Sequence, residues 1–139
     1  MANTFTQTVD RAFPREHTSP AYQGYQLLHI VFTALPLIAG ADKFLHLLAN
    51  WQMYLSPLAR RFSPLSDHNL MLLVGVVEMA AGLLVAVKPR WGAAVVASWL
   101  FLIIVNLVAA GAFLDIALRD FGLMLSACAL WRLSSDYYR

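Results

Sequence analysis

Four apolar segments, each close to the length of a membrane-spanning helix, constrain the fold of this chain more than any other feature. They cover residues 25–48, 70–87, 91–110 and 115–133. About 20 apolar residues cross the hydrocarbon core as a helix, and a backbone in lipid must satisfy its own hydrogen bonds. Hydrophobic residues make up 60% of the 139 residues and charged residues 13%, a more apolar composition than that of soluble domains. The sequence predicts an all-α, integral membrane four-helix bundle.

The connections between these segments predict how the chain is arranged around the membrane. Four helices that alternate in direction place both termini on the same side. Residues 49–69 mix aromatic, aliphatic and basic side chains, which is typical of an interfacial segment lying on the membrane. Residues 1–24 form a polar N-terminal tail ahead of a membrane domain at 25–139. Six of the ten Lys and Arg residues fall on the side of the termini, which favours cytoplasmic termini.

Several classes of function are disfavoured by the composition and by the motifs. The formal charge of +2 without a basic run argues against nucleic-acid binding. Cys128 is the only cysteine, so no intrachain disulfide can form. The sequence contains no phosphate-binding loop, nucleophile elbow or zinc-protease motif. His46 and His68 match no ligand spacing, and we predict no metal centre.

Strongly polar side chains gather at one end of the predicted helices. Because neighbouring helices are antiparallel, the end of the first lies beside the start of the second, and the end of the third beside the start of the fourth. Ionisable groups in membrane helices usually face the bundle interior and form pairs. We therefore predict one cluster in the outer half of the membrane. Its members are Asp42, Lys43, His46, Glu78, Asn106, Asp115, Arg119 and Asp120.

Three interpretations of this cluster remain open at the level of sequence. It can be an ion-pair network that fixes helix packing, a pocket for a small ligand or quinone head group with a role in proton exchange, or a contact with a partner subunit. Asp42 and Lys43 differ by about 100° around their helix, as do Arg119 and Asp120. We therefore expect at most one member of each pair to point straight into the core.

Three stretches together resemble the DoxX-like family of small four-helix membrane proteins. They are AGADKFLHLLANWQMYLSP, VGVVEMAAGLLVAVKPRWGA and NLVAAGAFLDIALRDFGLMLSACAL. The features that carry the resemblance are Gly-x-Asp-Lys-Phe at 40–44, Glu78, and the Arg119–Asp120 pair. The resemblance implies a four-helix bundle in a prokaryotic inner membrane, and some relatives are associated with quinone-linked redox complexes.

The functional expectation combines the polar cluster with this resemblance. The first hypothesis is an accessory or structural subunit of a membrane redox or respiratory complex. The alternatives are a quinone-binding or small-ligand-binding component of a membrane oxidoreductase, and a small transporter or proton path. No catalytic residue is assigned and no intrinsic cofactor is expected, although a quinone is a possible ligand. The expected partners are the lipid bilayer and either other subunits or further copies of the chain.

Overall fold

The structure, a computed structural model, describes residues 19–138, and these residues are helical for most of their length. Its elements are α2 (Pro20–Leu45), η2 (Trp51–Tyr54), α3 (Pro57–Phe62), α4 (Asp67–Val87), α5 (Pro89–Ala110) and α6 (Leu114–Tyr137). No strand occurs between residues 19 and 138, which confirms the all-α prediction. Residues 1–18 of the predicted polar tail lie outside the described residues.

The first long helix begins earlier than the hydropathy pattern predicts. We expected the membrane domain to start at residue 25, whereas α2 starts at Pro20. The reason is a local cap: the Ser19 hydroxyl accepts a hydrogen bond from the Tyr22 amide at 3.1 Å, and proline suits the first helical position. The same Ser-Pro arrangement starts α3, where the Ser56 hydroxyl accepts from the Ala59 amide at 3.0 Å.

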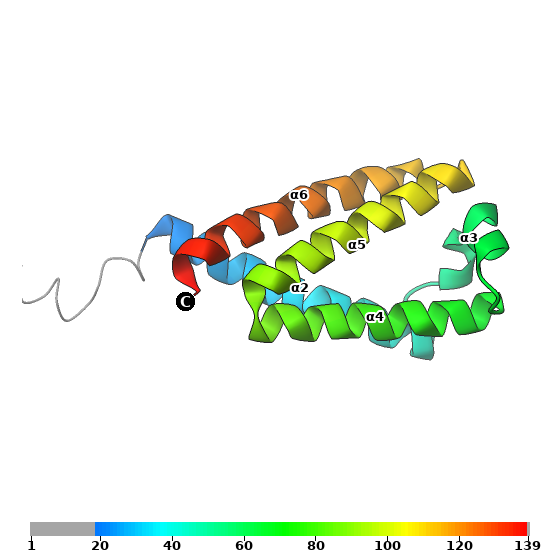
Figure 1. Ribbon diagram of the computed structural model, residues 1–139, viewed down its shortest axis with the longest axis horizontal. Coiled ribbons are helices and arrows are strands. Elements are labelled where there is room, and N and C mark those ends of the chain that lie inside the picture. Colours follow the sequence, from blue (N-terminus) through cyan, green and yellow to red (C-terminus); the bar gives the residue numbers. More distant parts are fainter. Residues whose placement is uncertain (1–18, 139) are drawn as a thin grey trace, which may run out of the picture.

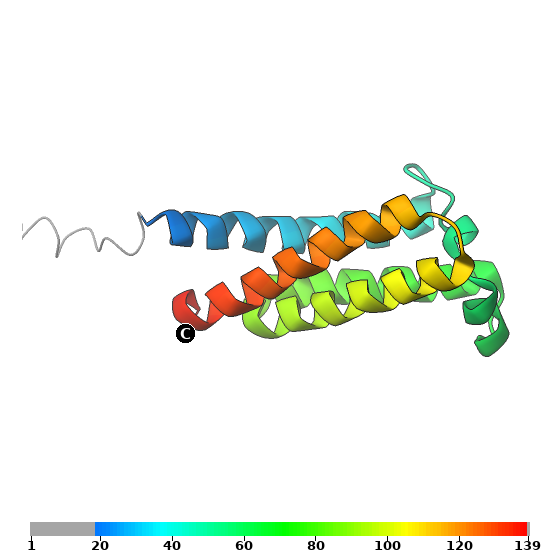
Figure 2. The same cartoon turned by 90° about the horizontal axis from the view of Figure 1, so that it is seen from above.

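The four long helices form two packed pairs. Helix α2 lies along α4, and α5 lies along α6. The pairs approach each other at the end that holds the α4–α5 turn and diverge toward the end that holds α3 (Figure 1). Seen from above, α6 runs obliquely to α2 (Figure 2). The start of α2 and the end of α6 both lie at the closely packed end (Figure 1).

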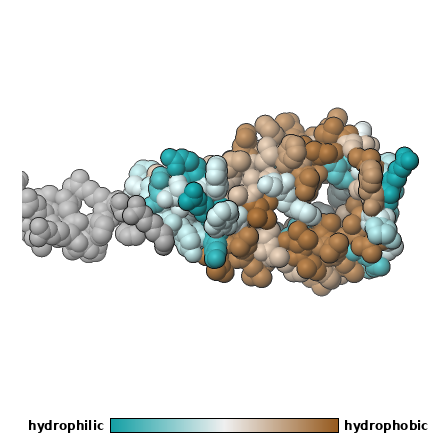
Figure 3. Space-filling model, viewed as in Figure 1, coloured by the Kyte–Doolittle hydropathy of each residue, from teal (hydrophilic) through white to brown (hydrophobic). Residues whose placement is uncertain are grey.

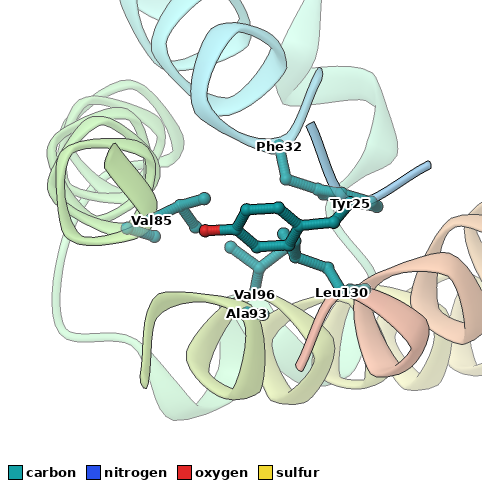
Figure 4. Packing of buried hydrophobic residues seen from close by; sticks show 8 residues of the cluster. Tyr25, Phe32, Val85, Ala93, Val96 and Leu130 are labelled. Atoms are coloured by element: carbon teal, nitrogen blue, oxygen red, sulfur yellow. The ribbon is translucent and has the colours of Figure 1, made fainter. Parts of the chain in front are cut away.

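An apolar core fills the closely packed end. The Tyr25 ring of α2 lies between Val85 of α4, Val96 of α5 and Leu130 of α6 (Figure 4). Gly92 brings α5 onto α4, because a Cβ atom placed there would lie 2.4 Å from the Val85 Cα atom. Only glycine permits this separation, and the pairs are therefore tightest where Val85 and Gly92 meet.

Among residues 19–138, three helices are long and apolar enough to cross a membrane, namely α2, α4 and α5. Large apolar side chains are exposed along all three, such as Leu27, Leu73 and Phe101. The space-filling view shows this apolar surface between more hydrophilic ends (Figure 3). Helix α6 has 24 residues but carries charged residues near both ends, and it is not among the three. The fourth predicted span remains a prediction.

Candidate functional site

The last turn of α2 places two charged residues of the predicted cluster inside the protein. Asp42 is 4% exposed and Lys43 is 3% exposed. We expected at most one of these neighbours to point straight into the core: Lys43 pairs with Glu78 of α4, whereas Asp42 is covered by the chain that follows α2. The helix ends at Leu45, His46 takes a left-handed conformation with φ of 55°, and the following residues fold back toward Asp42. Residues 47–51, the returning chain, cover the Asp42 carboxylate, which α2 alone would leave exposed.

The Asp42 carboxylate organises this returning chain. Its Oδ1 atom accepts hydrogen bonds from the Leu47 amide at 2.9 Å and the Leu48 amide at 3.0 Å. Its Oδ2 atom accepts from the Trp51 indole at 2.7 Å. Hydrogen bonds to a charged acceptor are stronger than neutral ones. The side chain therefore serves as an anchor for residues 47–51, with both oxygen atoms engaged.

Lys43 and Glu78 form a buried ion pair that joins α2 to α4. The Nζ atom lies 2.5 Å from Glu78 Oε2, and the two side chains are 3% and 10% exposed. The same ammonium lies 3.8 Å from the centre of the Trp51 ring, a cation–π contact. It also donates to the Ala39 carbonyl at 3.4 Å. Each charge therefore has a direct opposite charge, and the cation has additional partners.

Two glycines explain how the long helices come close enough for this pair. A Cβ atom at Gly40 would lie 2.6 Å from the Gly75 carbonyl oxygen, and one at Gly75 would lie 2.7 Å from the Gly40 oxygen. Such distances are too short for any side chain. The Lys43 Cβ atom lies beside Gly75, and the extended side chain reaches Glu78 one turn along α4. Close glycine contacts of this kind are common between membrane helices.

Asn106 binds the connection between α2 and α4 to the end of α5. Its Oδ1 atom accepts a hydrogen bond from the Ser56 amide at 3.0 Å. Its Nδ2 group donates to the Tyr54 carbonyl at 2.7 Å. One amide side chain thus satisfies two backbone groups between η2 and α3. Asn106 lies at the predicted end of the molecule, but its hydrogen bonds go to this connection and not to the Lys43–Glu78 pair.

His46 follows the last residue of α2 and is exposed. Its ring faces that of His68 with a centroid distance of 5.9 Å and an interplanar angle of 13°. The His68 Nδ1 atom lies 3.3 Å from Gln52 Nε2. Among residues 19–138, no group of three or more His, Cys, Asp or Glu side chains is arranged to hold a metal ion.

The three cluster members on α6 form a separate set. Arg119 is 67% exposed and its guanidinium lies 3.3 Å from the Asp120 carboxylate, which is 8% exposed. This inward and outward division follows the 100° rotation that the sequence predicts. Asp115 is exposed at the start of α6. Within the part of the chain that the structure describes, no ion pair joins these residues to Lys43 or Glu78.

Sequence reasoning missed two residues that complete the site. The sequence pattern indicates an interfacial anchor at Trp51, but the indole contacts both Asp42 and Lys43. Tyr54 supplies a carbonyl to Asn106. A tryptophan nine residues after an aspartate carries no recognisable signal, because their contact depends on how the chain turns after His46. Composition alone therefore could not place Trp51 in the cluster.

The polar side chains of this site bind other parts of the same chain. Asp42 is bound by the returning chain, Lys43 by Glu78, and Asn106 by the connection. The chain matches no model of a protein family, and no curated protein or solved structure shows a significant match to it.

Proposed function

We propose that this chain is an integral membrane four-helix bundle in a prokaryotic inner membrane, with α6 as the fourth span and cytoplasmic termini. The apolar surfaces of α2, α4 and α5 support this proposal, as do the hydrophilic ends (Figure 3). The charged residues of α6 lie near its two ends, and residues 121–131 between them carry no charge. Charges near the ends of a helix can reach the membrane interface.

Membrane insertion and orientation can be tested with one set of variants. The protein should stay in the membrane pellet after alkaline carbonate extraction. For orientation, Cys128→Ser removes the only cysteine, and Ser63→Cys or Ser135→Cys introduces one at either end. An impermeant maleimide should label Ser63→Cys in intact cells and Ser135→Cys only after permeabilisation. The reverse labelling would contradict cytoplasmic termini, and labelling of both variants in intact cells would contradict four spans.

Within this membrane setting, the function that the geometry supports best is that of an accessory subunit of a redox or respiratory complex. The observation that carries it is the internal pairing of Lys43 with Glu78. A deep carboxylate paired with a buried ammonium group contributes to helix packing. The resemblance to the DoxX-like family supplies the link to redox complexes. The exposed apolar surface leaves room for neighbouring subunits.

Purification under mild conditions tests the accessory role. After solubilisation in a mild detergent or in native nanodiscs, the protein should migrate with larger subunits whose haem or flavin absorbance is visible. A stable monomer without cofactor absorbance under both conditions would contradict it. Glu78→Gln should lower the yield of folded protein, because it leaves Lys43 as a buried charge without a counter-ion. A folded Glu78→Gln protein that has lost only activity would favour a functional site.

A second candidate function is the binding of a quinone or another small ligand near Asp120. The observation that favours it is the difference in exposure within the Arg119–Asp120 pair: the Asp120 carboxylate is buried, whereas the Arg119 side chain is 67% exposed. This pair lies on the part of α6 where the two helix pairs diverge, and the surface is hollowed between α5 and α4 (Figure 3). Lipid extracts of the purified protein should then contain quinone, and Asp120→Asn should reduce the amount. Extracts without quinone would remove this candidate.

A further inference from the structure

The outward face of α5 carries a shallow apolar groove that the polar cluster does not use. It is lined by Trp91, Ala94, Val95, Ser98, Trp99 and Leu102. Ala94 and Ser98 are small and lie one turn apart, and larger side chains surround them. From residue 91 to residue 102 the groove is about 16 Å long at 1.5 Å per residue. That length is close to one leaflet, or half of the ~30 Å hydrocarbon core.

The side-chain polar atoms of Ser98 and Trp99 in this groove are already engaged or covered. The Ser98 hydroxyl donates to the Ala94 carbonyl at 2.9 Å. The Trp99 indole nitrogen is buried and has no hydrogen-bond partner among the described residues, so it lies away from the open surface. Apart from the exposed Trp91 indole at its end, the groove therefore offers an apolar surface, which suits a hydrocarbon chain better than a polar head group.

Two basic residues stand at the end of the groove that lies nearest the α4–α5 turn. Arg90 precedes Ala94 by four residues and therefore shares its helix face, and Lys88 adjoins the start of α5. Both are exposed. Within residues 19–138 neither forms an ion pair. Trp91 follows Arg90 directly in the chain, is exposed and lines the groove, and tryptophan is enriched at membrane interfaces.

We propose that this groove binds one acyl chain of an anionic phospholipid, with the phosphate at Arg90 and Lys88. The inference depends on the proposed membrane insertion. It is carried by the charge complementarity at one end and by the apolar groove of one-leaflet length that follows. Under the proposed orientation the basic end faces the cytoplasmic leaflet, where anionic lipids attract basic residues near a membrane surface.

Tryptophan quenching by brominated lipids tests this proposal. The protein, with Trp131→Phe to remove an exposed tryptophan of α6, is reconstituted in phosphatidylcholine vesicles. These contain brominated phosphatidylglycerol or, in a parallel series, brominated phosphatidylcholine with the same chains. Because only the head group differs, the ratio of the two apparent association constants reports head-group preference. We expect this ratio to favour phosphatidylglycerol by about fivefold or more for two basic residues.

Three variants make the result specific to the groove. Arg90→Gln should bring the ratio several-fold closer to one. Arg132→Gln is the matched control, since it removes an exposed arginine of α6 that pairs with Asp136, and it should leave the ratio unchanged. Ala94→Leu fills the groove and should reduce quenching by brominated phosphatidylglycerol. All three replaced residues lie at least partly at the surface, and circular dichroism checks their folding.

The possible failures are distinguishable. Equal constants for the two lipids, or equal losses with Arg90→Gln and Arg132→Gln, would overturn the lipid site while leaving membrane insertion intact. Unchanged quenching in Ala94→Leu would overturn the placement of the chain in the groove. If neither brominated lipid quenches any tryptophan, the protein is not inserted, and the proposed function fails together with the lipid site.

Discussion

The ammonium group of Lys43 lies 2.5 Å from the carboxylate of Glu78, and both side chains are at least nine-tenths buried. The contact joins residues that are 35 positions apart in the chain. Trp51 covers the same ammonium. Three elements, α2, α4 and η2, therefore meet at the Lys43–Glu78 pair. Replacing one of the two residues should affect stability differently from replacing both.

Replacing one member of this pair should destabilise the protein far more than replacing both. Lys43→Met or Glu78→Leu alone leaves a buried charge unpaired, which costs about 3–5 kcal/mol, whereas an apolar replacement of both partners is often neutral or stabilising. Thermal unfolding in detergent, measured for both single variants and the double variant, checks this. A double variant as unstable as the sum of the singles would show that the two residues do not act as a pair.

Glycine replacement at the α2–α4 contact should separate the two helices. In Gly75→Ala the new methyl group would lie 2.7 Å from the Gly40 carbonyl oxygen, so the backbones must move apart and the Lys43–Glu78 contact must lengthen. We expect a loss of about 1–3 kcal/mol, the typical cost of overpacking, measured as a lower midpoint of thermal unfolding.

Gly122→Ala is the matched control for that experiment. Gly122 lies within α6, and a Cβ atom placed there would meet no atom of another element within 4 Å. Alanine also has a higher helix propensity than glycine by about 1 kcal/mol. The variant should be as stable as the wild type or more stable. Equal destabilisation at positions 75 and 122 would exclude the close contact as the cause.

Asn106→Leu should release the connection between α2 and α4 from α5. It removes the hydrogen bonds to Ser56 and Tyr54, worth roughly 1 kcal/mol each. Hydrogen–deuterium exchange at residues 51–56 should become faster, while exchange at the Tyr25 end of the bundle stays slow. Asn69→Ala is the control, because it retains the backbone amide that Asn69 donates to the Ser66 cap. Unchanged exchange in Asn106→Leu would contradict the role given to this amide.

Asp42→Asn and Trp51→Phe should be strongly coupled. The asparagine retains one acceptor atom, but its NH2 group cannot accept the indole hydrogen bond that Asp42 Oδ2 receives. A hydrogen bond to a charged group contributes about 1.5–3 kcal/mol. A double-mutant cycle on unfolding free energies should therefore give a coupling of at least ~1 kcal/mol. Additive effects would indicate that the indole contributes by packing alone.

The apolar segments predicted the positions of the long helices, because burial in lipid and burial in a core both require apolar runs. The start of α2 differed because Ser19 and Pro20 form a cap within a polar stretch. The predicted separation of Arg119 from Asp120 is confirmed, since it follows from helix geometry alone. Element positions are thus encoded locally, and a cap can override the average hydropathy.

The partners within the cluster could not be predicted in the same way. The position of Glu78 along α4 follows from the sequence, but the rotation of α4 about its axis does not, so the sequence cannot decide between Lys43 and Arg119 as the partner of Glu78. The Gly40–Gly75 contact selects Lys43 by bringing α2 against α4. The burial of Asp42 depends on a left-handed His46, a conformation that non-glycine residues adopt uncommonly. Contacts that depend on tertiary packing in this way do not produce a periodic pattern in the sequence.

The order of Lys43 and Glu78 along the chain has a consequence for biosynthesis. In the proposed membrane setting, α2 leaves the ribosome first and carries its lysine two residues from the helix end, where a long side chain can reach the interface. Glu78 follows in the interior of α4, where a lone carboxylate is most costly. Its counter-ion is already in place when it arrives. The order of the two residues therefore favours insertion of α2 and α4 together as a helical hairpin, in which Glu78 pairs with Lys43 as α4 enters the membrane.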